Sequence, residues 1–184
     1  ETKEQSKQWV KKGSPGPIKC KTQASRVKQM VLAFHDREGL IYTNMVPRGT
    51  TVNAEYIISA LKVFLKRMRQ KRPLKLEAGF ILHWDNALVH TARIVRDFLA
   101  TKEKIEMLDH PPYSPDLAPC DFFLFPKLKN KLAGEFLSVE TFKTRWDRVA
   151  ATLTKDDYTG CYAKWVERHR KCIRIRGSYV EKSE

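Results

Sequence analysis

Residues 80–84, Phe-Ile-Leu-His-Trp, form a nearly continuous apolar run that ends at the turn-forming pair Asp85 and Asn86. A short run of this kind is typical of a strand that is buried at the centre of a sheet. Such a strand needs helices to cover the sheet, and the chain has helical periodicity before and after it. We therefore predict an α/β fold in which a small mixed sheet is flanked by helices.

The segments around this run carry the signals of a hairpin and of several helices. Residues 27–34 and 40–46 are predicted strands joined by a short polar turn, which together make a β-hairpin. Apolar side chains at helical spacing predict a helix over residues 53–70, with Asn53 as its N-cap and Pro73 as its end. Further helices are predicted over residues 91–100 and 121–132, the second with a kink or early turn at Pro126. A strand is predicted over residues 105–108. Two more helices are predicted, one from Ser138 and a last one from a capping box at residues 154–157.

The charge of the chain is strongly positive but unevenly placed. Lys and Arg number 35 against 21 Asp and Glu, so the formal charge is +14 at pH 7. The excess lies in residues 1–26, 62–75 and 164–176, and the rest of the chain is slightly acidic. Basic patches suit contact with a phosphate backbone, although for any single patch a solvated helix face that binds nothing is the alternative. Because no apolar run is long enough to span a bilayer and no segment is a long basic amphipathic helix, the charge predicts an anionic partner, nucleic acid before a membrane.

Two carboxylates are candidate metal ligands. Asp85 ends the buried strand, where α/β sheets present ligand groups, and Asp121 follows a loop with four prolines among residues 110–119. Hard carboxylates on rigid elements suit Mg²⁺, and two such ions are the usual apparatus for phosphodiester chemistry. The same two residues are also consistent with a turn former and a helix N-cap, and the residues alone leave that alternative open.

Two sequence blocks, residues 83–92 and 110–129, closely resemble the signature blocks of mariner-type transposases. The opening residues 1–9 and the closing residues 165–179 also resemble that family, so the resemblance covers essentially the whole chain. It implies an RNase H-like fold with three acidic metal ligands, which bind Mg²⁺ or Mn²⁺ in a two-metal site. The metal activates water to cut DNA at the transposon ends, and then the freed 3′ hydroxyl to attack target DNA.

By motif, Asp85 matches the second catalytic acid of the family and Asp121 the third. The first acid lies on an opening strand a short way upstream of the match to Glu1, so the first strand is expected to be missing or incomplete here. Asp36 falls in the hairpin turn and does not match it. Asp85 and Asp121 are also one position farther apart than the family pattern, and we place the extra residue within residues 102–104.

The resemblance also implies an organisation in two parts. Residues 1–26 form a basic arm with Gly and Pro that resembles the clamp loop of the family, and residues 27–184 form the RNase H-like catalytic domain. Because the family cuts and joins DNA in the nucleus and works as a dimer, we expect a nuclear protein that binds double-stranded DNA, and no membrane, and that forms a homodimer through this arm.

Eleven residues are candidate DNA contacts, and they are mostly basic side chains in the three basic segments. They are Lys11, Lys12, Lys66, Arg67, Arg69, Lys71, Arg72, His90, Arg168, Arg170 and Lys171. Residues 66–72 are equally consistent with a nuclear import signal, and a structural role is the alternative for His90.

The resulting hypothesis is a catalytic domain of a mariner-type DNA transposase that performs metal-dependent cleavage and strand transfer. It is incomplete in this chain because the first catalytic Asp is absent. The alternative is a catalytically inactive, transposon-derived fragment that binds DNA or dimerises. A host nuclease with an RNase H-like fold is disfavoured because the long match is to transposases.

Overall fold

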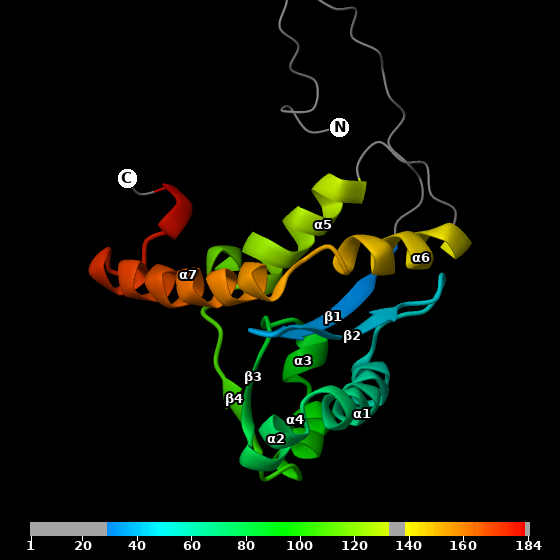
Figure 1. Cartoon of the computed structure of the whole chain (residues 1–184). Coiled ribbons are helices and arrows are strands. Elements are labelled where there is room, and N and C mark those ends of the chain that lie inside the picture. Colours follow the sequence, from blue (N-terminus) through cyan, green and yellow to red (C-terminus); the bar gives the residue numbers. More distant parts are fainter. Residues whose placement is uncertain (1–28, 133–138, 183–184) are drawn as a thin grey trace, which may run out of the picture.

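A computed structural model describes residues 29–132 and 139–182 of the chain (Figure 1). The strands are β1 (Val31–Asp36), β2 (Gly39–Met45), β3 (Phe80–His83) and β4 (Ile105–Leu108). The helices are α1 (Ala54–Lys71), α2 (Pro73–Ala78), α3 (Leu88–Thr91), α4 (Arg93–Ala100), α5 (Phe125–Leu132), α6 (Val139–Ala150) and α7 (Lys155–Arg174). Short 3₁₀ turns lie at Pro115–Leu117 and Val180–Lys182, and a π-helical turn at Cys120–Leu124 precedes α5.

The predicted hairpin is confirmed as the antiparallel pair β1 and β2. Its turn is closed by the Asp36 side chain, whose Oδ1 accepts a hydrogen bond of 2.9 Å from the backbone N–H of Glu38. Gly39 follows with a φ of 135°, a conformation that a residue with a Cβ rarely adopts. A register shift between Phe34 and His35 bends the first strand just before the turn.

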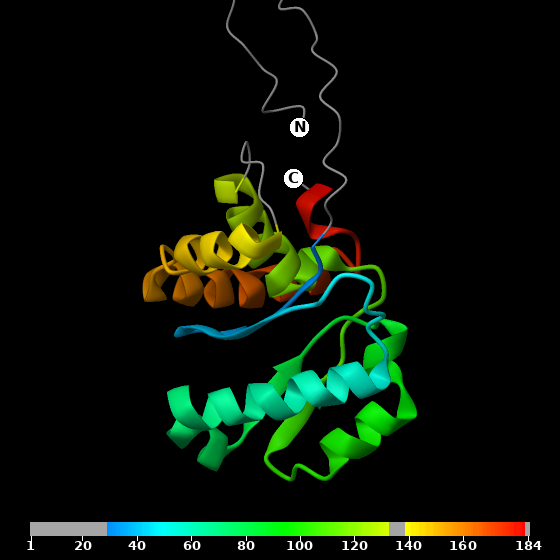
Figure 2. The same cartoon turned by 90° about the vertical axis from the view of Figure 1, so that its right-hand side faces the viewer.

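The hairpin separates two hydrophobic cores. On one face, Leu32 and Phe34 pack against α1, where the Phe34 and Phe64 rings stack with centroids 4.5 Å apart. On the other face, Val31 and Ala33 pack against the core formed by α5, α6 and α7. Because successive side chains of a strand point to opposite faces, this alternation lets one hairpin serve both cores. Figure 2 shows the resulting layers, with the hairpin between α1 and the C-terminal helices.

The first long helix forms as predicted, with Asn53 as its N-cap. Asn53 Oδ1 accepts a 2.9 Å hydrogen bond from the backbone N–H of Tyr56. Pro73 ends this helix, but it also begins α2, which was not predicted. Proline is well suited to a first helical position because its missing N–H needs no partner there.

The strand predicted over residues 80–84 is β3, and it pairs in parallel with β4. The pairs run from Phe80 with Ile105 to His83 with Leu108. Both strand orientations of a mixed sheet are thus present, yet within the described ranges the four strands form two separate two-stranded sheets. β1 and β3 each have one hydrogen-bonded neighbour there, which leaves one edge of each strand unpaired.

Local signals placed the later helices with two exceptions. The helix predicted over 91–100 is divided into α3 and α4, and the start of the one predicted over 121–132 is the π-helical turn at Cys120–Leu124. The capping box at the start of α7 is confirmed, because Thr154 and Asp157 exchange hydrogen bonds of 3.2 and 2.9 Å. The predicted arm and the Ser138 cap lie outside the described residues. Within those residues, no helix is both long and apolar enough to cross a membrane.

His35 lies half-buried between the hairpin and the C-terminal helices. Its ring contacts Phe123, Tyr158 and Tyr162, and the Tyr162 hydroxyl donates a 3.0 Å hydrogen bond to the His35 carbonyl. Burial disfavours the charged ring and lowers the pKa of His35 from 6.5 to about 4.

This burial predicts a specific loss of stability in acid. Between pH 6.5 and about 4, an unfolded chain binds a proton at His35 that the folded chain does not, so stability falls as the pH falls through that window. From pH 7 to pH 5 the contribution of His35 to the free energy of unfolding should decrease by about 2 kcal/mol. Urea unfolding of the wild type and His35→Gln at both pH values measures this. Equal pH dependence in the two proteins would contradict the prediction.

Candidate active site

Asp85 lies two residues after the end of β3, in the segment that leads into α3. Its Oδ1 accepts a 3.1 Å hydrogen bond from the backbone N–H of Ala87 and lies 2.8 Å from Nδ1 of His90. The His90 ring is stacked on Trp84, with centroids 4.5 Å apart and planes 8° apart. The stacking on Trp84 therefore fixes the His90 ring, and the ring in turn orients the carboxylate of Asp85 through its contact with Oδ1.

The Asp85 carboxylate is charged and accessible. Its hydrogen bond with His90 holds its pKa below the ordinary value, against the opposing effect of partial burial. The side chain is 57% exposed, and both hydrogen bonds described above go to Oδ1. Oδ2 accepts no hydrogen bond from any residue of the described ranges, so it is available to an incoming group.

Asp121 faces the same groove as Asp85. This groove has a volume of about 540 Å³ and is lined by residues of β1, β3, the π-helical turn and α7. The pKa of Asp121 is raised above its ordinary value, chiefly because the carboxylate is partly buried and further because of the negative charge of Asp85. The structure thus places both predicted metal ligands on one groove, where the negative charge of Asp85 disfavours the ionised form of Asp121.

The proline-containing loop before Asp121 is attached to the end of β3. Nε2 of His83 lies 3.0 Å from Nδ1 of His110, and the Asn86 side-chain amide donates a 2.6 Å hydrogen bond to the His110 carbonyl. Burial, followed by the nearby His110 and His169, lowers the pKa of His83 to about 4, so this imidazole is neutral at pH 7. The histidines therefore fix the loop relative to Asp85.

The far end of that loop is held by α7 and by the C-terminal 3₁₀ turn. Trp165 Nε1 donates a 2.7 Å hydrogen bond to the Leu117 carbonyl, and Arg168 Nη1 donates one of 2.8 Å to the Asp116 carbonyl. The Asp116 side chain is 3% exposed and accepts a 2.7 Å hydrogen bond from the backbone N–H of Val180. These contacts position Asp121, and they were not predicted from the sequence because each joins residues 48 to 64 positions apart.

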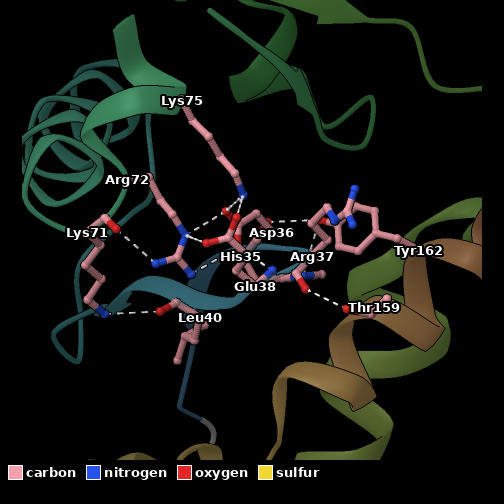
Figure 3. A network of polar contacts seen from close by, with 10 residues as sticks. All are labelled: His35, Asp36, Arg37, Glu38, Leu40, Lys71, Arg72, Lys75, Thr159 and Tyr162. Carbon is pink, nitrogen blue, oxygen red and sulfur yellow. Dashed lines mark hydrogen bonds and ion pairs between the residues drawn. The ribbon is translucent and has the colours of Figure 1, made fainter. Parts of the chain in front are cut away.

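Asp36, the remaining acid of interest, has cationic partners within the chain (Figure 3). Its Oδ2 lies 2.9 Å from Nε of Arg72 and 2.7 Å from Nζ of Lys75, and Glu38 contacts the same two cations. Burial alone raises the pKa of Asp36, but the hydrogen bonds from Arg72 and Lys75 outweigh it and lower the pKa. The network attaches the hairpin turn to the junction of α1 and α2, and it leaves Asp36 unsuited to bind a metal.

Several candidate DNA contacts also have partners within the chain. Nζ of Lys71 donates a hydrogen bond of 3.1 Å to the Leu40 carbonyl, Nζ of Lys171 donates one of 3.2 Å to the Val180 carbonyl, and Arg67 donates one of 3.0 Å to Gln70. Lys66 and Arg69 are exposed on α1, and Arg170 is exposed on α7. Lys11 and Lys12 lie outside the described residues. The role of these residues in binding DNA stays a prediction.

The chain has an RNase H-like fold, with helices on both sides of small sheets and two candidate carboxylates, one after β3 and one before α5. A family profile described as Transposase (partial DDE domain) matches residues 1–78. The Mariner Mos1 transposase of Drosophila mauritiana is 35% identical over 178 residues, which cover 95% of this chain and 51% of that protein. The chain thus spans about half the length of this curated relative.

Solved structures agree with the sequence comparison. The crystal structure of the Mos1 mariner paired end complex with Mn matches at a TM-score of 0.85 and 35% identity, over 94% of this chain and 51% of that chain. A structure of the Mos1 transposase catalytic domain with raltegravir and Mn matches at a TM-score of 0.78 and 37% identity, over 82% of this chain and 76% of that chain. The chain belongs to the mariner transposase family.

Proposed function

We propose that this chain is most of the catalytic domain of a DNA transposase that cuts and joins phosphodiester bonds with a divalent metal. The main observation that supports this proposal is that Asp85 and Asp121 line the same groove. Matching Mos1 structures contain Mn or Mg, which agrees with the hard oxygen donors of this groove.

In this proposal each element around the groove has a defined task. Asp85 and Asp121 hold Mg²⁺ or Mn²⁺, and in the complete protein they share a two-metal site with a third acid. The metal, when bound, activates the attacking oxygen and stabilises charge on the phosphate. His90 orients Asp85, while the loop of residues 110–119 positions Asp121. Because these groups are fixed before DNA binds, little reorganisation is needed during the reaction.

The unpaired edges of β1 and β3 support the proposal that a further strand lies between them in the complete protein. Residues 31–37 and 80–85 line the two sides of the same groove, and each strand has one partner within the described ranges. Unpaired strand edges readily accept another strand. We infer that the opening strand, which carries the first acid in the family, docks between them, joins the two sheets and completes the metal site.

A nicking assay on supercoiled plasmid with Mg²⁺ or Mn²⁺ tests this proposal. The 184-residue chain is expected to show no cleavage above background, whereas a longer product of the same gene that includes the upstream strand should nick the plasmid. Strong cleavage by the 184-residue chain that is lost in Asp85→Ala would show that its metal site is already complete. A longer protein that binds DNA without cutting it would support a non-catalytic role instead.

We further propose double-stranded DNA, a second copy of the chain and the nucleus as the partners and location. The matching Mos1 structures include paired end complexes and a complex with a left transposon end, which supports a DNA partner. Dimerisation is assigned to residues 1–26, which lie outside the described residues. Sedimentation of the chain with and without residues 1–26 tests that assignment.

A further inference from the structure

A second groove lies between α1, α2 and the turn that joins α4 to β4, and it does not belong to the candidate active site. Its volume is about 850 Å³. Its lining residues come from three elements and are named here as the basic groove. They are Lys62, Leu65, Lys66 and Arg69 of α1, Pro73, Leu76 and Glu77 of α2, and residues 101–105 of the turn and the start of β4.

The basic groove carries a net positive charge, and the described part of the chain supplies no ion pair to its cations. Its cations are Lys62, Lys66, Arg69, Lys102 and Lys104, and its acids are Glu77 and Glu103. Among residues 29–132 and 139–182, none of these five cations forms an ion pair. Arg72 and Lys75, only a few positions away, are instead engaged by Asp36 and Glu38. The same basic segment is thus divided into paired and unpaired cations.

The cations are held on backbone of fixed geometry. Lys62, Lys66 and Arg69 follow one stripe of α1, which spans about 10 Å at a rise of about 1.5 Å per residue. Across the groove, the Lys104 carbonyl accepts a 2.9 Å hydrogen bond from the backbone N–H of Phe80, and the Lys102 N–H donates one of 2.8 Å to the Leu99 carbonyl. Two separate elements therefore present positive charge to one groove.

The basic groove lies at the opposite end of β3 from Asp85. β3 spans about 10 Å between Phe80 and His83, at ~3.3 Å per residue, and Asp85 lies two residues farther along the chain. In Figure 1, α2 and the turn before β4 lie at the bottom of the molecule, away from α7. A ligand in the basic groove is therefore not at the metal site.

We propose that the basic groove binds the phosphate backbone of double-stranded DNA at a point away from the bond that is cut. This assignment rests on the proposed function, since it takes the same substrate class. Unpaired cations on two elements suit a polyanion, and the stripe on α1 matches an extended row of phosphates better than a single anion. Leu65 and Leu76 also line the groove, and apolar surface of this kind suits the methylene stems of lysine side chains.

The test compares two triple variants of the 184-residue chain that lose the same charge. The groove variant is Lys62→Gln, Lys66→Gln and Arg69→Gln. The matched control is Arg48→Gln, Arg93→Gln and Arg96→Gln, three exposed cations that do not line the groove. Affinity for a fluorescent duplex is measured by anisotropy between roughly 50 and 200 mM salt, and melting temperatures confirm that both variants fold.

The groove variant is expected to reduce the slope of log K against log salt by about 2 to 3, at ~0.9 per phosphate contact, and the control by less than one. Equal slopes in the two variants would overturn the assignment. Poly-glutamate at equal charge concentration is then tested as a competitor of the duplex. If it displaces the duplex from the wild type but not from the groove variant, the assignment is overturned, and the groove binds an acidic protein segment instead. Nicking by the longer protein is scored separately, so loss of the groove assignment leaves the proposed function standing.

Discussion

Asp85→Asn is expected to lower metal-dependent cleavage by the longer, strand-complete protein by about a thousand-fold or more. A divalent ion supplies several kcal/mol of transition-state stabilisation, and each 1.4 kcal/mol corresponds to about tenfold in rate. Asparagine keeps the shape of the side chain, and its Oδ1 still accepts the hydrogen bond from Ala87, so the turn into α3 is retained. The loss of cleavage in Asp85→Asn therefore measures the effect of removing the negative charge of the proposed metal ligand. Single-turnover cleavage of end-labelled DNA at saturating Mg²⁺ measures it.

The control for this prediction is Asp109→Asn, which removes the same charge from an exposed residue beside the proline-containing loop. This variant should cleave within a few-fold of the wild type, because Asp109 does not line the groove. Asp121→Asn should behave like Asp85→Asn. If Asp85→Asn retains cleavage within tenfold of the wild type, Asp85 is a turn former and not a metal ligand.

Those parts of the fold that depend on local signals were predictable from the sequence. The hairpin, the Asn53 cap and the Thr154 capping box each depend on residues within a few positions of one another, and all three form as predicted. A break near Pro126 was predicted within residues 121–132, and the helix changes there from a π-helical turn to α5. The π-helical form of the first turn had no local signal, and its residues Phe123 and Leu124 are buried in the C-terminal core. The hydrogen bonds that hold Asp116 were also missed, because they join residues 52 and 64 positions apart in the sequence.

The candidate site was predictable in its ligands but not in its supporting contacts. A strand end and a sequence block marked Asp85 and Asp121, since both signals are local. No local signal distinguishes Arg69, which lines the basic groove, from Arg72, which binds Asp36. The two residues lie three positions apart in one basic run, and only the position of the hairpin turn decides which of them is paired. The sequence therefore overestimates how many cations are available to DNA.

Leu124→Ala is expected to lower the free energy of unfolding by about 3 to 4 kcal/mol, a large part of the ~5–15 kcal/mol that stabilises a typical domain. Leu124 is 0% exposed and belongs to the core formed with Trp146, Val149 and Tyr158, so its removal leaves a cavity that rigid neighbours cannot fill. Urea unfolding at pH 7 measures the loss.

The matched control is Leu74→Ala on α2, where the side chain is 78% exposed and the same truncation should cost less than about 0.5 kcal/mol. Leu124 also lies in the π-helical turn that carries Asp121. A cavity beneath this turn should therefore loosen the position of the carboxylate, so cleavage by the longer protein should fall in Leu124→Ala even under conditions where the variant remains folded. If Leu124→Ala costs no more stability than Leu74→Ala, the turn is not anchored by the C-terminal core. Asp121 would then be positioned by the loop contacts of His110 and Asp116 alone.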